Sequence, residues 1–135
     1  MILGGIGVVG GVISGILGGW DAGIKALLWM MGIDFASGLI VAGVFKKSGK
    51  SETGALDSRA GWKGLFRKGM TLAIVIIAVQ LDTLMNTNFI RDAVVIAYIA
   101  NEMLSIAENA GLMGVPFPDY IKDALDTLNN KNKIE

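Results

Sequence analysis

The fold is decided by residues 69–111, which read GMTLAIVIIAVQLDTLMNTNFIRDAVVIAYIANEMLSIAENAG. Two apolar stretches, 69–86 and 90–111, are joined here by a short connection that carries no charge. Each stretch is about 20 residues long, which is the length that an α-helix needs to cross a bilayer. The alternation of apolar and polar residues that a membrane β-barrel requires is not seen. The stretch therefore predicts a hairpin of two transmembrane helices.

Two further apolar segments precede this hairpin. Residues 22–45 predict a third transmembrane helix, and residues 1–19 form a glycine-rich segment without a charged side chain. As a helix, the N-terminal segment would reach about 28 Å, which is barely the thickness of the hydrocarbon core. It lacks the basic start of a signal peptide, so we expect no cleavage. We expect it to form a fourth span, with a position in the membrane interface as the alternative.

The composition favours a membrane protein and excludes several kinds of site. Hydrophobic residues make up 53% of the 135 residues and charged residues only 18%, which is unusually apolar for a soluble domain. The absence of His and Cys excludes disulfides, His/Cys zinc sites and Ser-His or Cys-His catalytic pairs. A formal net charge of zero gives no general attraction to nucleic acid. We expect an all-α integral membrane protein with no cofactor and no metal.

The distribution of charge predicts how the chain is oriented. Residues 46–68 hold seven Lys and Arg against two acids, so the positive-inside rule places this connection in the cytoplasm. Binding of anionic lipid headgroups is an alternative reason for the same charge. Pro116 and Pro118 end the last membrane helix, and residues 116–135 then predict a short amphipathic helix in the cytoplasm. The chain thus divides into a transmembrane domain, residues 1–115, and a C-terminal tail.

The N-terminal segment repeats glycine at four-residue spacing. The repeat consists of Gly7, Gly11, Gly15 and Gly19. Small residues at this spacing let two helix backbones approach closely in lipid, where packing drives helix association. The alternative is a flexible N-terminus, because each glycine lowers helix stability by about 1 kcal/mol relative to alanine. The length and regularity of the repeat favour a helix-packing face, whose partner is either another copy or the same chain.

The last apolar stretch, residues 90–111, carries a polar face. At about 100° per residue, this face collects Tyr98, Asn101, Glu102, Ser105, Glu108 and Asn109, with Arg91 on the same side. An ionised carboxylate in lipid is unfavourable by at least a few kcal/mol, so the face must contact protein or water. It is either a polar seam that holds a helix bundle together or the wall of a water-filled channel, and both uses satisfy the same requirement.

Two acids interrupt otherwise apolar segments. Asp34 lies near the middle of its predicted helix, whereas Asp82 lies near the outer end of the next one. The dyad of an intramembrane aspartyl protease needs its two carboxylates at the same depth, so we reject that function. We expect Asp34 to be structural and Asp82 to pair with Arg91 across the hairpin.

Several of these motifs resemble those of a known family, the phage-lysis and toxin-secretion holins, which include clostridial toxin-release holins. The weaker matches are GGWD at residues 18–21, IDFASGL at 33–39, SRAGWKGLFRKG at 58–69 and LD at 81–82. The most specific match is NEMLSIAENAGLMGVPFPDYIKDAL, residues 101–125, which is similar to the family's Asn-Glu, Ser-Ile, Glu-Asn and Gly-Val-Pro-x-Pro pattern. Residues 1–17 match only in being apolar.

This resemblance implies a non-enzymatic protein of the bacterial cytoplasmic membrane that self-associates and permeabilises it. Its partners would be the lipid bilayer and other copies of the chain, and its cargo an endolysin or a secreted toxin. The resemblance also favours the channel-wall interpretation of the polar face, which a compact state would hide and an oligomer would turn to water. The resemblance marks the following residues, which we interpret as packing, oligomer and pore-wall positions without a catalytic role: Asp34, Gly38, Asp82, Asn101, Glu102, Ser105, Glu108, Asn109, Gly114, Pro116 and Pro118.

Two alternatives come from other functional classes. A small selective channel or transporter component, lined by the same acids, would pass ions but retain proteins. An antiholin would bind a pore-forming protein and delay it, and would not kill a cell when produced alone.

Overall fold

The structure, a computed structural model, is built from helices. It describes the backbone of residues 2–50 and 53–134, with all side chains of these ranges except Asn129 and residues 131–134. In chain order the elements are α1 (Ile2–Ile16), α2 (Ala22–Ile40), a π-helical turn η1 (Val41–Phe45), α3 (Ser58–Met85), α4 (Ile90–Leu112) and α5 (Asp119–Ile134). These ranges contain no strand, so the all-α prediction is confirmed. Four positions of the predicted segments lie outside the described residues: Met1, Ser51, Glu52 and Glu135.

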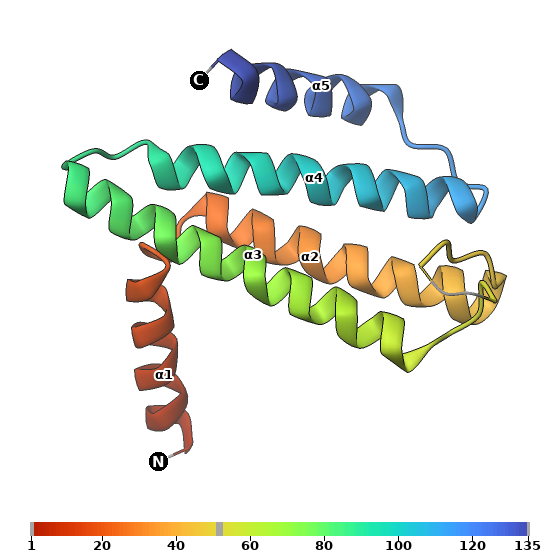
Figure 1. Cartoon of the computed structure of the whole chain (residues 1–135), viewed down its shortest axis with the longest axis horizontal. Helices are drawn as coiled ribbons and strands as arrows, with labels where there is room; N and C mark the ends of the chain where they lie inside the picture. The colour runs from red at the N-terminus through yellow and green to blue at the C-terminus, as the bar shows by residue number, and fades with distance from the viewer. Residues whose placement is uncertain (1, 51–52, 135) are drawn as a thin grey trace.

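Three helices form the body of the molecule. In Figure 1, α2, α3 and α4 run side by side along the long axis, and α5 lies along the outer side of α4. The α3–α4 turn lies at one end of this bundle, and the connection between η1 and α3 lies at the other end. Helix α1 points away from the bundle, across its long direction, from the end that holds the α3–α4 turn.

The bundle has a small apolar core and an apolar exterior. One buried cluster joins α2, α3 and α4 and contains Leu17, Ile24, Leu27, Met31, Val75 and Val95. Large apolar side chains also cover the outside, as at Trp29, Phe66 and Leu84, which are 73%, 72% and 81% exposed. Because three charged side chains, Asp34, Arg91 and Glu102, are buried while many large apolar ones face outward, much of the outer surface is suited to lipid.

Two continuous helical stretches, Ala22–Phe45 and Ser58–Met85, are long and apolar enough to cross a bilayer. The second begins at Ser58, so the connection predicted at 46–68 is helical in its second half. Helix α4 has sufficient length, but its sequence carries four charged residues, and it does not meet the same test of apolarity. Helix α1, of 15 residues, reaches only about 22 Å. Two of the predicted spans are thus supported, whereas those at α4 and α1 are not confirmed.

The glycine repeat is shorter in the structure than the sequence predicted. Helix α1 ends at Ile16, and Gly19 lies in the following turn with φ +107°, so it leaves the helix face. No described atom lies within 4 Å of a Cβ built at Gly7, Gly11 or Gly15. These glycines therefore do not pack against the described part of the same chain, which leaves lipid or another copy as their partner.

Helix α5 packs on α4 instead of standing apart as a tail. Leu125 is 5% exposed and forms a second apolar cluster with Ala100 and Met103 of α4. The charged side chains of Lys122 and Asp123 are exposed. Helix α5 therefore covers the side of α4 that does not face α2 and α3.

Candidate functional site

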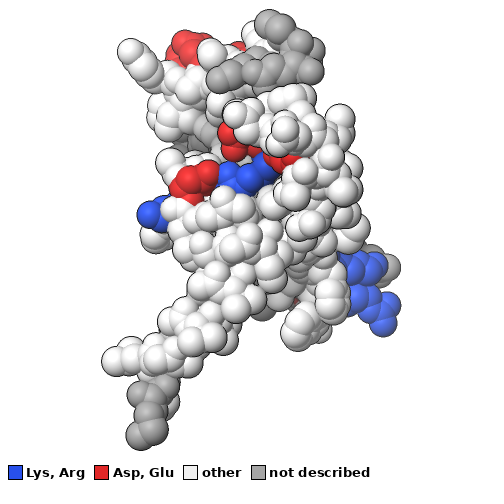
Figure 2. Space-filling view, turned by 90° about the vertical axis from the view of Figure 1, so that its left-hand side faces the viewer, with Lys and Arg blue, Asp and Glu red and all other residues white. Residues whose placement is uncertain are grey.

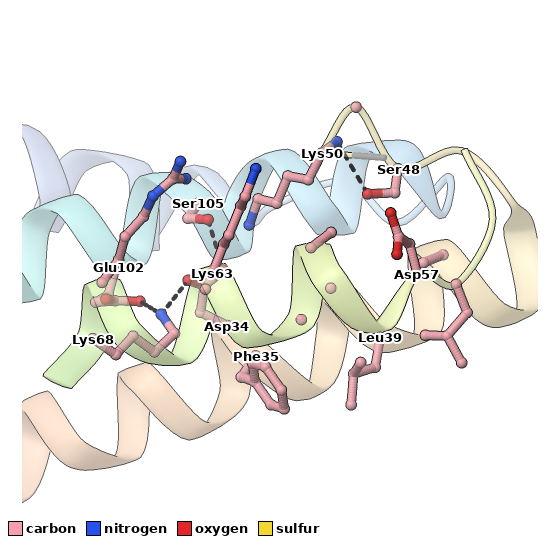
Figure 3. Close-up of a pocket in the computed structure, with 18 of the residues that line it drawn as sticks. Asp34, Phe35, Leu39, Ser48, Lys50, Asp57, Lys63, Lys68, Glu102 and Ser105 are labelled. Atoms are coloured by element: carbon pink, nitrogen blue, oxygen red, sulfur yellow. Dashed lines mark hydrogen bonds and ion pairs between the residues drawn. The ribbon is translucent and has the colours of Figure 1, made fainter. Parts of the chain in front are cut away.

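A buried ion triad lies where α2, α3 and α4 meet. The Nζ of Lys68 is 2.7 Å from Oδ2 of Asp34 and 2.7 Å from Oε2 of Glu102 (Figure 3). The two carboxylate side chains are only 6% and 7% exposed, and the lysine side chain 17%. Each residue comes from a different helix, so one ammonium group joins all three helices of the bundle. We call Asp34, Lys68 and Glu102 the triad.

Hydroxyl and amide donors complete the surroundings of Asp34. Ser105 Oγ donates a hydrogen bond to Asp34 Oδ1 at 2.6 Å, and Asn109 Nδ2 donates to the same oxygen at 3.2 Å. The amide of Asn109 also donates to Ser37 Oγ at 2.8 Å. Gly38 lies beside this amide, and a Cβ there would make an ordinary contact with Nδ2 at 3.8 Å. In the described part of the chain, every buried side-chain nitrogen and oxygen has a hydrogen-bond partner.

The triad has one more acid than it has bases. A buried charge is tolerated only when pairing and hydrogen bonds replace its lost hydration. Here one ammonium serves two carboxylates, and the donors from α4 supply the remaining interactions of Asp34. The arrangement holds three helices together through groups that water could also solvate. The triad can therefore hold the bundle closed, and its three side chains would be hydrated in an open state. We call this role of the triad the polar lock.

A second polar cluster surrounds Arg91 at the end of the bundle that holds the α3–α4 turn. Its Nε donates to the carbonyl oxygen of Leu17 at 2.7 Å, and Nη1 donates to Oδ2 of Asp21 at 2.5 Å. Asp92 lies 3.3 Å from Nη1. The hydrogen bond from Arg91 holds the pKa of Asp21 below its usual value. Figure 2 looks onto this end and shows acidic and basic atoms in a narrow band across the middle of the molecule, with separate basic and acidic patches at its edges.

Asp82 does not pair with the side chain of Arg91, so that prediction is wrong. Its Oδ1 accepts the backbone N–H of Ile90 at 3.0 Å, and its Oδ2 accepts the backbone N–H of Arg91 at 2.9 Å. The hydroxyl of Thr87 donates to Oδ1 at 2.6 Å. The first N–H groups of a helix lack partners within it, and Phe89, at the start of α4, gives no side-chain cap. Asp82 therefore caps α4, and the guanidinium of Arg91 binds the carboxylate of Asp21.

Comparison with known proteins identifies the family. The chain matches the bacteriophage holin family over residues 11–130, which is most of its length. The chain belongs to the bacteriophage holin family. The matched range contains the triad, the Arg91 cluster and most of α5. Membership of this family points to a non-enzymatic membrane protein.

Individual relatives agree with this assignment. A protein described as a probable holin, from Bacillus phage phi105, is 40% identical over 101 residues, which cover 74% of this chain and 69% of the relative. An uncharacterized protein of Clostridium perfringens is 36% identical over 133 residues, 97% of this chain and 93% of the relative. An uncharacterized protein of Bacillus subtilis is 40% identical over 111 residues, 82% and 74% of the two chains. No solved structure matches the chain.

In this holin-family chain, the polar face predicted for residues 90–111 divides into parts with different surroundings. The structure brings Glu102, Ser105 and Asn109 together with Asp34. Asn101 is exposed and lines a cavity beside the triad, and Glu108 is exposed and lies outside this network. Tyr98 packs against the apolar core, and Arg91 lies in the separate cluster at the bundle end.

Sequence reasoning missed Lys68 and Ser37. The positive-inside rule treats the charge of Lys68 as part of the cytoplasmic connection and so hides its place in a helix. The missed signal is Asp57, whose side chain accepts the backbone N–H of Arg59 at 3.0 Å and caps α3. A helix that starts at this cap continues through Lys68 into the apolar segment. Ser37 carries no signal of its own, because a hydroxyl in an apolar helix commonly bonds within its own helix.

Gly18 provides a test of the Arg91 cluster. It has φ +85°, and a Cβ there would lie 2.7 Å from Nε of Arg91. We expect Gly18→Ala to lower the free energy of unfolding by about 1–3 kcal/mol, measured by thermal unfolding in detergent. The control, Gly11→Ala, adds a Cβ to open space and should keep or slightly raise stability, by up to about 1 kcal/mol. Equal melting temperatures for the two variants would contradict the observed packing around Arg91.

Proposed function

We propose that this protein acts as a holin that oligomerises in the bacterial cytoplasmic membrane and opens a lesion large enough to pass a folded protein. The observation that carries the proposal is the buried triad inside an apolar exterior, in a chain of the holin family. Intramembrane ionisable groups of this kind face the bundle interior or a water-filled cavity and mark functional positions. The same groups suit both a closed bundle and an open aqueous lesion.

The bundle of α2, α3 and α4, without α5 along its side, would be the closed state of this holin. Helix α4 would form a third span, because its polar groups Glu102, Ser105 and Asn109 face α2 and α3 instead of lipid. In the oligomer, α4 would turn this face to water. Hydrogen bonds to water would then replace the hydrogen bonds to α2 and α3. Such a switch requires two packings that differ by only a few kcal/mol. The excess acid of the triad favours hydration and brings the two states closer in free energy.

The cargo we propose is an endolysin or a secreted toxin. The phage relative is described as a probable holin, and a phage holin fits release of a cell-wall enzyme. Another relative comes from the bacterium Clostridium perfringens, and in a bacterium the same lesion would serve export of a folded toxin. In both cases the partners of the chain would be the lipid bilayer and further copies of itself, with the exposed glycine face of α1 available for contact between copies.

The orientation we propose has the basic connection and the C-terminus in the cytoplasm. Helix α5 lies along α4 in the compact bundle, and its exposed Lys122 and Asp123 are unsuited to lipid. It would therefore move away from α4 once α4 spans the bilayer.

Because the chain has no cysteine, single cysteines can report its topology. In intact cells, a membrane-impermeant thiol reagent should label Asn88→Cys and leave Asp123→Cys unlabelled; the reverse pattern would contradict this orientation.

The function is tested by inducible expression in a bacterial host that also makes a cytoplasmic endolysin. We expect culture turbidity to fall abruptly after a delay, because the enzyme reaches the cell wall only through a large lesion. A selective channel would collapse ion gradients and leave the endolysin inside, so turbidity would stay constant. An antiholin alone would neither kill the host nor release the enzyme. Either of these two results would contradict the proposed function.

A further inference from the structure

A cavity opens beside the triad toward the basic connection. It has a volume of about 530 Å³, which is within the range of small-molecule sites. The triad forms its inner wall, and α3 contributes the small residues Ala60, Gly61 and Gly64. These three positions add little or no side-chain volume, which helps to leave the cavity open. We call it the vestibule.

Three cations line the vestibule in addition to Lys68 of the triad. Lys50, Lys63 and Arg67 make no ion pair with any described residue. The side chains of Lys50 and Lys63 extend toward the same region in Figure 3. The acids that share the lining are already engaged: Asp34 and Glu102 by Lys68, and Asp57 by the N-terminus of α3. The positive charge without an ion pair among the described residues is thus concentrated in one part of the vestibule, which we call its mouth.

Aromatic side chains on the neighbouring face of α3 indicate the depth of this mouth. Trp62 is 62% exposed and Phe66 is 72% exposed, and their ring centroids lie 5.9 Å apart. Exposed Trp residues of membrane helices concentrate at the level of the lipid headgroups. Lys63 and Arg67 directly follow these aromatics in the chain, so the cations lie at the level of the lipid phosphates.

We propose that the vestibule binds the phosphate group of an anionic phospholipid, such as a phosphatidylglycerol headgroup. Lys50, Lys63 and Arg67 would contact the phosphate oxygens, and the acyl chains would lie along the apolar outer faces of α2 and α3. A basic pocket between membrane helices on the cytoplasmic side is suited to such a headgroup. The inference rests on the membrane placement given under the proposed function, but it concerns binding and not the lesion.

Binding is tested by native mass spectrometry on the full chain purified in detergent. The probes are phosphatidylglycerol and phosphatidylcholine at equal concentration, with glycerol phosphate as a soluble competitor. The variant Lys63→Gln/Arg67→Gln removes two lining cations. The control Lys46→Gln/Lys47→Gln removes two cations of the same connection that do not line the vestibule. A further variant, Lys50→Gln, lies outside every helix and so leaves the helices unaltered.

The wild-type chain should retain phosphatidylglycerol in preference to phosphatidylcholine. We expect the Lys63/Arg67 variant to bind it on the order of tenfold more weakly, Lys50→Gln a few-fold more weakly, and the control within twofold of wild type. Equal loss in the control, or no preference between the two lipids, would overturn the site. If an equal concentration of glycerol phosphate displaced the phospholipid, the site would be one for a soluble phosphate, and the proposal of a lipid ligand would be contradicted. Because no lesion is needed, lipid retention by a chain that fails to release endolysin would sustain this site and contradict only the proposed function.

Discussion

Replacing the triad with apolar side chains, as Asp34→Leu/Lys68→Met/Glu102→Leu, is expected to give a folded membrane protein that releases no endolysin. Exchange of a buried ion cluster for apolar residues of similar volume is often neutral or stabilising, because it removes the cost of desolvating the charges. The closed bundle should therefore keep or raise its melting temperature. The open state should lose the groups that water would solvate, so turbidity should remain constant for many times the wild-type delay.

This triple variant separates the two uses of the polar face. If the triad only holds the bundle together, an apolar replacement that folds should release endolysin on the wild-type schedule, and that result would contradict a role in the lesion. Asp92→Leu is a suitable control, since it removes a charge from the same helix where the side chain is 65% exposed. We expect this control to permeabilise the membrane normally.

Removing only the base of the triad should have the opposite effect on stability. In Lys68→Met, two buried carboxylates are left without their shared counter-ion. Loss of one partner from a buried ion pair typically lowers stability by about 3–5 kcal/mol. We expect a large fall in the melting temperature in detergent and poor accumulation in the membrane.

Two comparisons make the Lys68 prediction specific. Lys63→Met removes a lysine from the same helix that has no ion pair among the described residues, and it should change stability by less than about 0.5 kcal/mol. Adding Asp34→Asn and Glu102→Gln to Lys68→Met neutralises the acids and should restore most of the lost stability. If the Lys68→Met chain had the same melting temperature as the wild type, the triad would not stabilise the bundle.

The helices were predictable from the sequence because lipid imposes simple requirements on length and polarity. The apolar runs from 22 and from 69 correspond to α2 and to the inner part of α3, and the polar face of residues 90–111 belongs to α4. The start of α3 was not predicted, since both explanations of the seven basic residues in 46–68, topology and lipid binding, treat them as part of a connection. Asp57 was the local signal for the true start.

The contacts of the site were less predictable, because they depend on how helices pack. Ser105 meets Asp34 across 71 positions of sequence, and only the relative rotation of α2 and α4 selects Ser105 over the exposed Glu108. The sequence predicts Asp82 as the partner of Arg91. In the structure its partner is Asp21, since Asp82 is drawn to the free N–H groups at the start of α4. Periodicity identifies a polar face, but it does not identify which members of that face meet a neighbour.

The most direct test of the polar lock is the accessibility of position 105 to water during permeabilisation. Ser105→Cys is close to isosteric, and the chain has no other cysteine. We expect a water-soluble maleimide to leave this cysteine unlabelled before the lesion opens and to label it when endolysin is released. Leu104→Cys, on the neighbouring exposed apolar surface, should remain unlabelled throughout. Release of endolysin while Ser105→Cys stays unlabelled would contradict a lesion lined by the polar face of α4.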